Sequence, residues 1–141
     1  MRSTSLVLLC VALASSVALA DKPITELRQR AATASLNDQP KAYVELAEAD
    51  LDLVNTYYDA ADVEQARKAL DELVNASEKA GHAAIQSNKR VKQTEIAIRK
   101  MSKKLADIQR TVDFEQREAV QKAIDSLENM RTALLNHMFK K

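Results

Sequence analysis

An apolar heptad pattern over residues 63–111 constrains the fold more than any other feature of this sequence. Apolar or small residues recur there at alternating steps of four and three, and the segment contains no proline. This spacing is typical of an α-helix that carries one continuous apolar stripe. One helix over the whole segment is about 70 Å long, far longer than a compact domain of this mass is wide. The stripe consists of Ala66, Leu70, Leu73, Ser77, Ala80, Ala84, Ser87, Val91, Thr94, Ile98, Met101, Leu105 and Ile108.

The middle of this segment leaves two interpretations open, because it is rich in small residues. A glycine inside a helix costs about 1 kcal/mol relative to alanine. A close crossing with another helix would explain the small side chains and keep one continuous helix, which is the interpretation we favour. A break between Gly81 and Asn88 is the alternative, and it gives a compact bundle of five shorter helices. The small residues are Ser77, Ala80, Gly81, Ala83, Ala84 and Ser87.

The composition of the whole chain also favours helices. The sequence has one glycine, two prolines and 4% aromatic residues, which is low for a mixed fold. Pro23 suits the first turn of a short N-terminal helix, and Pro40 suits the first turn of the next. We therefore divide the chain into a signal peptide (1–20), a short N-terminal helix with a linker (21–39) and a helical-hairpin or coiled-coil domain (40–141).

Two shorter helices are expected to flank the long one. Apolar residues at helical spacing predict them at about 41–60 and 114–138. Asp62 and Asp113 stand where N-caps are expected for the helices that follow them. We predict an all-α antiparallel bundle in which both flanking helices fold back on one long central helix (about 63–111).

The first twenty residues have the pattern of an export signal. Arg2 is basic, residues 6–14 are apolar, and Ala18-Leu19-Ala20 offers the small residues that a signal peptidase recognises. Cleavage near Ala20 removes Cys10, so no disulfide is expected in the mature protein. We predict an exported protein, periplasmic or secreted, whose mature chain has no integral membrane segment.

Residues 47–77 resemble a single tetratricopeptide helical hairpin. Leu53, Tyr57, Ala66 and Leu70 match that family's Leu, Tyr, Ala and large apolar positions, and the segment 61–66 is similar to its turn. Ala61 stands where the family has a glycine. The resemblance implies a helical-hairpin scaffold for contact with a partner, and it supplies no site residues.

No group of residues indicates catalysis or cofactor binding. The chain after residue 20 has no cysteine, and neither a Gly-rich phosphate loop nor a haem attachment motif occurs. His82 lies at an outward heptad position, where a solvated side chain is expected. His137 lies beside Met138, but methionine at helical spacing is far more typical of a core than of a copper site. We predict no enzyme activity, no metal and no cofactor.

Charge is distributed unevenly along the chain. Residues 41–80 contain four basic and ten acidic side chains, whereas residues 81–104 contain seven basic residues and one glutamate. These segments could pair in an antiparallel homodimer, or the basic one could meet an acidic partner. Ordinary solvated faces are the interpretation we favour for these charges. Nucleic acid is not expected, because the aromatic residues that stack on bases are missing. The candidate partner-binding basic face consists of Lys89, Arg90, Lys92, Arg99 and Lys103, with Lys100 and Lys104 also basic.

Taken together, these patterns favour a protein that acts by contact. We expect a non-enzymatic exported scaffold or protein-interaction module that binds a protein partner or a second copy of itself. The alternative hypothesis is a periplasmic chaperone-like or stress-response binder, which would hold unfolded or hydrophobic partners in the alanine-rich middle of the chain.

Overall fold

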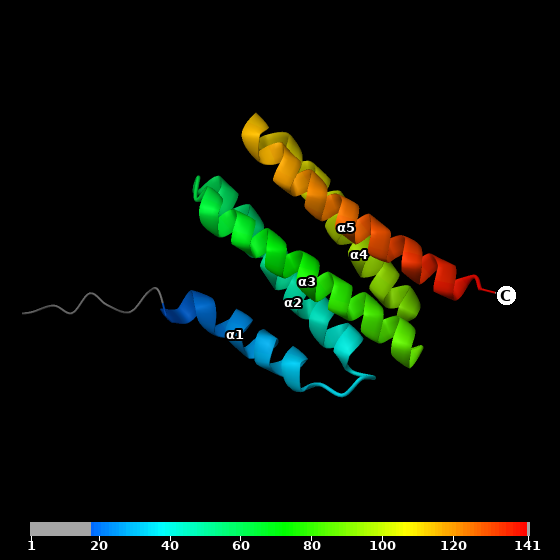
Figure 1. The fold of residues 1–141 in the computed structure, drawn as a ribbon. Coiled ribbons are helices and arrows are strands. Elements are labelled where there is room, and N and C mark those ends of the chain that lie inside the picture. Colours follow the sequence, from blue (N-terminus) through cyan, green and yellow to red (C-terminus); the bar gives the residue numbers. More distant parts are fainter. Residues whose placement is uncertain (1–17, 141) are drawn as a thin grey trace, which may run out of the picture.

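Five helices form the part of the chain that the structure, a computed structural model, describes, namely residues 18–140 (Figure 1). No strand occurs among these residues, so the prediction of an all-α bundle is confirmed. The greater part of the predicted signal peptide, residues 1–17, lies outside the described residues and stays a prediction. The helices are α1 (Ala18–Thr33), α2 (Gln39–Asp59), α3 (Val63–Ser87), α4 (Val91–Thr111) and α5 (Phe114–Met138).

The expected single helix over residues 63–111 needs a correction, because the chain turns back after Ser87. Asn88 and Arg90 adopt left-handed conformations with φ of 54° and 56°. Asparagine tolerates this conformation at the end of a helix better than most residues. The spacing of the apolar stripe continues unchanged across the turn, and α3 and α4 each bury their part of it. The structure therefore has the five shorter helices of the alternative interpretation.

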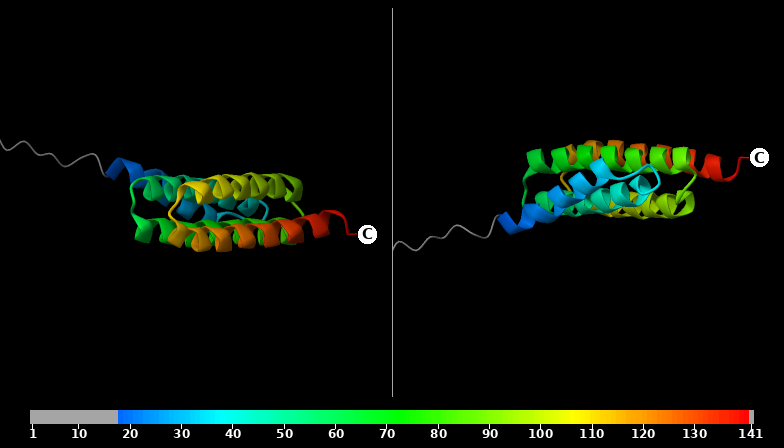
Figure 2. Two further views of the ribbon diagram at one scale, coloured as in Figure 1. Left: turned by 90° about the horizontal axis from the view of Figure 1, so that it is seen from above. Right: turned by 90° about the horizontal axis from the view of Figure 1, so that it is seen from below.

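Two helical hairpins, α2–α3 and α4–α5, form the body of the bundle in two layers (Figures 1 and 2). α2 lies beside α4 in one layer, and α3 lies beside α5 in the other. Because successive helices run antiparallel, the neighbours within each layer run parallel. α1 packs against α2 on the side of the bundle away from α5 (Figure 1).

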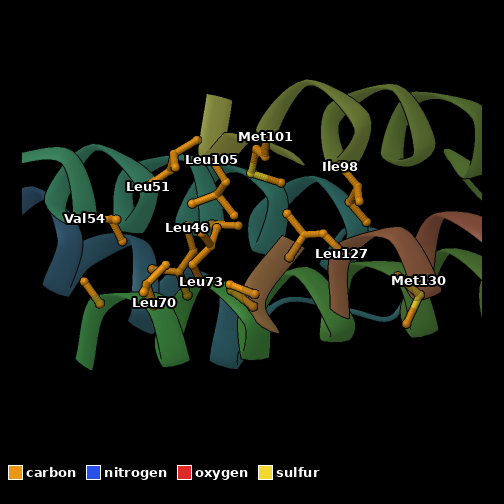
Figure 3. Close-up of a cluster of buried hydrophobic side chains, with 14 of the residues drawn as sticks. Leu46, Leu51, Val54, Leu70, Leu73, Ile98, Met101, Leu105, Leu127 and Met130 are labelled. Atoms are coloured by element: carbon orange, nitrogen blue, oxygen red, sulfur yellow. The ribbon is translucent and has the colours of Figure 1, made fainter. Parts of the chain in front are cut away.

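The core lies where the two hairpins meet. Figure 3 shows apolar side chains from α2, α3, α4 and α5 converging there. Burying them away from water is the main favourable contribution to the fold. Folding α4 back on the bundle, instead of extending it, buries its half of the heptad stripe as well. The largest fully buried apolar side chains are Leu73, Ile98, Leu105, Leu127 and Leu134.

The small residues in the middle of the sequence serve close packing between α3 and α5. A Cβ atom on Gly81 would lie 2.1 Å from the sulfur of Met130, so only glycine allows this approach without a shift. Ala80 and Ala84 are fully buried. The alanine-rich middle of the chain, where the chaperone-like hypothesis expected a partner to be held, is therefore packed inside the bundle.

The helix ends follow the sequence in part. The predicted last helix coincides with α5, and the predicted helix at 41–60 differs from α2 by two residues or fewer at each end. Asp62 caps α3 as expected, because its Oδ1 accepts a hydrogen bond from the Gln65 backbone N–H at 3.3 Å. Asp113 is the N-cap residue of α5, as predicted, but its side chain makes no capping bond.

Candidate functional site

An open groove lies between α3 and α5. Its volume is about 540 Å³, and it extends over residues 67–78 of α3 and 115–126 of α5. Val74 and Ala119, which are partly exposed, contribute apolar surface to it. The groove therefore offers about three helical turns of partly apolar surface at the outside of the bundle.

The groove exists because α5 faces α3 with small side chains at this end of the bundle. Ala119, Ala123 and Ser126 line it and are too short to fill the space between the two helices. Farther along the same pair of helices, Met130 packs directly on Gly81 and fills the equivalent space. Side-chain size thus opens one half of the α3–α5 interface and closes the other.

Carboxylates dominate the rim of this groove, which we call the acidic groove. Two basic side chains also lie there, and each already has a partner. The Lys122 ammonium lies 3.4 Å from the Glu118 carboxylate, and Arg67 Nε donates to Gln116 Oε1 at 3.2 Å. The rim is therefore net negative. Its acidic residues are Asp71, Glu78, Glu115 and Glu118.

The predicted basic face is exposed, but the basic residues in and around it lie on two different sides of α4. On one side, α4 lies beside the acidic residues of α2: Lys104 Nζ is 3.5 Å from Asp52 Oδ1. Arg90 lines the same surface cleft as Glu45 and Glu48 of α2. The opposite charges of residues 41–80 and 81–104 therefore meet partly within one molecule. All five predicted residues are exposed: Lys89, Arg90, Lys92, Arg99 and Lys103.

A second group of basic residues stays on the outer side of α4. Lys92, Arg99 and Lys103 follow one another at helical spacing, and the partly exposed Ile96 lies between them. Arg99 Nε is 3.9 Å from Glu95, a weak ion pair. Within the described residues, neither Lys92 nor Lys103 makes an ion pair. We call these four residues the α4 basic stripe.

A buried aspartate that the sequence analysis missed lies where α2 meets α1 and α3. Asp50 is only 1% exposed, and its Oδ1 has no hydrogen-bond partner among the described residues. Burial raises the pKa of Asp50 to about 7, and the neighbouring Glu72 carboxylate adds to the effect, while the Arg28 guanidinium opposes it. Arg28 of α1 also hydrogen-bonds Glu72 of α3. The only sequence signal was an aspartate on the apolar stripe of α2.

A second buried carboxylate, Glu95 of α4, is paired with an arginine of α5. Arg131 Nε donates to Glu95 Oε1 at 2.9 Å, and Arg131 Nη1 donates to Glu128 at 3.2 Å. The Ser102 hydroxyl donates to the other oxygen of Glu128 at 2.8 Å. Hydrogen bonds to Glu95 and Glu128 raise the pKa of Arg131 above its ordinary value. This network holds α4 against α5.

The histidines do not form a reactive centre. His82 is exposed, as predicted, and His137 Nε2 lies 3.0 Å from Asn88 Oδ1, where it ties the end of α5 to the turn between α3 and α4. Among residues 18–140, no three side chains of His, Cys, Asp or Glu gather as a metal site would require. The expected absence of a catalytic residue, metal or cofactor stays a prediction.

Comparison of the chain with known protein families, curated proteins and solved structures finds no match. Within the described part of the chain, every helix is too short or too polar to cross a membrane. The assignment of a function therefore depends on the surfaces of the bundle.

Proposed function

We propose that this chain is a non-enzymatic helical scaffold that binds a protein partner through the acidic groove. The observation that carries the proposal is the groove itself: an open surface with apolar side chains and a rim of four carboxylates. An amphipathic helix that lays its apolar side in such a groove is a common mode of protein recognition. The α4 basic stripe provides a second contact surface.

The chain itself contains an example of this mode of contact. α1 packs on the α2–α3 hairpin through Ile24 and Ala31, which are buried. Its arginines pair with acidic residues on both helices of that hairpin: Arg28 bonds Glu72, and Arg30 Nη1 lies 3.5 Å from Glu45. A helix with small apolar residues and flanking cations thus binds an acidic surface of this bundle, which supports a similar ligand for the acidic groove.

Export and a tetratricopeptide-like scaffold belong to the same proposal. The apolar segment and small residues before Asp21 support export to a periplasm or to the outside of the cell. The family-like pattern in residues 47–77 covers most of the α2–α3 hairpin, and Ala61, at the family's glycine position, has a left-handed φ of 57°. A scaffold of stacked hairpins offers such surfaces to partner helices.

Site-specific photo-crosslinking in the organism that encodes the chain tests this proposal. A photoreactive amino acid at Ala119 or Ser126, which line the acidic groove, should yield a covalent adduct of discrete mass on irradiation. The same amino acid at Asn55, an exposed position on α2, is the control and should yield none. If the groove positions give no adduct with any protein, the proposal is wrong.

A chaperone-like binder remains a second candidate because of two exposed aromatic residues. Phe114 and Phe139, at opposite ends of α5, are 83% and 76% exposed. Exposed apolar side chains of this size are typical of surfaces that contact other molecules. This function requires binding of a hydrophobic dye and suppression of aggregation, both of which should fall in Phe114→Ser/Phe139→Ser. A wild-type chain that does neither would exclude it.

A further inference from the structure

We propose that the acidic groove between α3 and α5 binds the α4 basic stripe of a second copy of this chain. This inference rests on the proposed function and names the partner for that groove. It is a contact between two different surfaces of identical molecules, and it is carried by the charges that remain after the bundle has formed.

The first argument is the pairing within the monomer. The cations of α4 that face α2 are balanced there, as the 3.5 Å distance between Lys104 and Asp52 shows. Lys92 and Lys103 have no ion pair among the described residues. Of the groove acids, Asp71 and Glu115 likewise make no ion pair in the described part of the chain. The stripe therefore carries unpaired positive charge, and the acidic groove carries unpaired negative charge.

The second argument is the match in length and polarity. The groove extends from Arg67 to Glu78 on α3, about 17 Å at 1.5 Å per residue. The stripe from Lys92 to Lys103 has the same length, about 17 Å. Ile96, partly exposed and outside the hydrophobic core, lies within the stripe and can meet the apolar surface of the groove. An apolar centre with a charged rim is typical of specific protein contacts.

The third argument concerns the geometry of the bundle. The groove lies in the layer of α3 and α5, whereas the stripe lies on α4, in the layer of α2 and α4 (Figure 2). The two surfaces therefore belong to different sides of one molecule, and each can be engaged by a different neighbour. Contacts of this heterologous kind close into rings or continue as open chains. Because the surfaces are short, we expect weak association that salt reverses.

Analytical ultracentrifugation of the purified chain at concentrations up to about 1 mM tests the proposal. At about 0.02 M salt the average mass should rise with concentration, and about 0.5 M salt should abolish the rise. Two charge-reversed variants, one for each surface, should stay monomeric. Asp71→Lys/Glu118→Lys reverses one acid on each side of the groove, and Lys92→Glu/Lys103→Glu reverses the two unpaired lysines of the stripe.

Mixing these two variants provides the decisive result. The reversed groove of one then faces the reversed stripe of the other, and their unchanged surfaces also remain complementary, so an equimolar mixture should regain association. The control variant Lys41→Glu/Lys140→Glu changes the net charge by as much as Lys92→Glu/Lys103→Glu does, and in the same direction, but at exposed positions outside both surfaces. It should associate like the wild type. Circular dichroism verifies that all variants remain helical.

Two outcomes would overturn the inference: a wild-type chain that is monomeric at every concentration in low salt, or variants whose mixture stays monomeric. Neither would decide the proposed function, which depends on crosslinks at Ala119 and Ser126 to a partner of any identity. A crosslinked product at twice the mass of the chain would support both proposals, and a product that contains a different protein would support the scaffold and argue against a second copy.

Discussion

The two hairpins have the same topology but treat their buried polar groups differently. In α2–α3, the buried atoms Asp50 Oδ1, Tyr58 OH and Ser77 Oγ have no hydrogen-bond partner among the described residues. In α4–α5, Glu95 is also buried, but Arg131 donates a hydrogen bond to it. The turns differ as well: Ala61 between α2 and α3 has a φ of 57°, whereas Val112 and Asp113 between α4 and α5 have ordinary negative φ.

This difference predicts that buried polar groups cost the α2–α3 hairpin more folding free energy than they cost α4–α5. An unsatisfied buried polar group costs free energy that a paired one does not. Local conflicts of this kind concentrate where a protein retains a feature for a reason other than stability. The α2–α3 hairpin also contributes α3 to the acidic groove and binds α1.

The largest effect is expected in the paired hairpin. Arg131→Ala leaves the Glu95 carboxylate buried with only Arg99, 3.9 Å away, as a cation nearby, and we expect the largest loss in the free energy of unfolding among these variants at pH 7. Urea unfolding followed by circular dichroism measures it. Arg110→Ala, which removes an exposed ion pair with Asp107, is the control and should change stability little. Equal effects of the two changes would contradict the importance of the network.

Replacing Asp50 should raise the free energy of unfolding, whereas replacing Arg131 lowers it, and the gain should depend on pH. Its folded-state pKa of about 7 lies above the ordinary 3.8, so the folded chain holds a proton that the unfolded chain releases between these values. Stability should therefore fall as the pH rises from about 4 to about 7, and stay lower above that. Asp50→Asn, which cannot ionise, should unfold at higher urea than wild type at pH 8, by about 2 kcal/mol, with little gain at pH 4.

A pH series for both proteins separates this effect from other titrations. The variant should lose the part of the pH dependence between pH 4 and pH 7 that the wild type shows. Glu72 and Arg28, which face Asp50 from α3 and α1, remain in both proteins. Parallel curves for the two proteins would mean that Asp50 does not titrate as described.

The attachment of α1 gives a smaller test of the same region. Arg28→Ala removes the bond to Glu72 and the positive charge that opposes the raised pKa of Asp50. We expect a loss of about 1 kcal/mol, because the pair is partly solvated, together with faster hydrogen exchange in α1. Gln29→Ala, at an exposed neighbouring position, should leave exchange in α1 unchanged.

The smallest effect is expected at the turn of the weaker hairpin. Ala61→Gly should stabilise the chain by about 0.5 to 1 kcal/mol, since glycine adopts a positive φ without the steric cost that alanine has. Thermal unfolding measures the change. Ala60→Gly, one residue earlier at a φ of −84°, should be neutral or destabilising. A gain at Ala60 as large as at Ala61 would argue against relief of strain.

Local patterns predicted much of the fold. The spacing of Val120, Leu127 and Leu134 located α5, and Asp62 marked the start of α3, because capping and amphipathic periodicity act within a few residues. The same periodicity could not locate the turn at Asn88. Residues 88–90 connect α3 to α4 without changing the spacing of the apolar residues. The apolar pattern of the sequence is therefore the same as that of one uninterrupted helix. The predicted basic face was exposed, yet its binding role stays a prediction.

The sequence by itself determined that the chain is helical, which faces are apolar and where most helices end, since these depend on neighbours one or two turns apart. Tertiary structure alone decided that Glu95 forms an ion pair with Arg131 while Asp50 Oδ1 has no hydrogen-bond partner among the described residues, and that Lys104 pairs with Asp52 while Lys92 does not. It also decided that small residues leave a groove at Ala119 and close the gap at Gly81. The reason is physical: burial, ion pairing and cavity volume depend on which helices lie side by side, and long-range packing sets that arrangement.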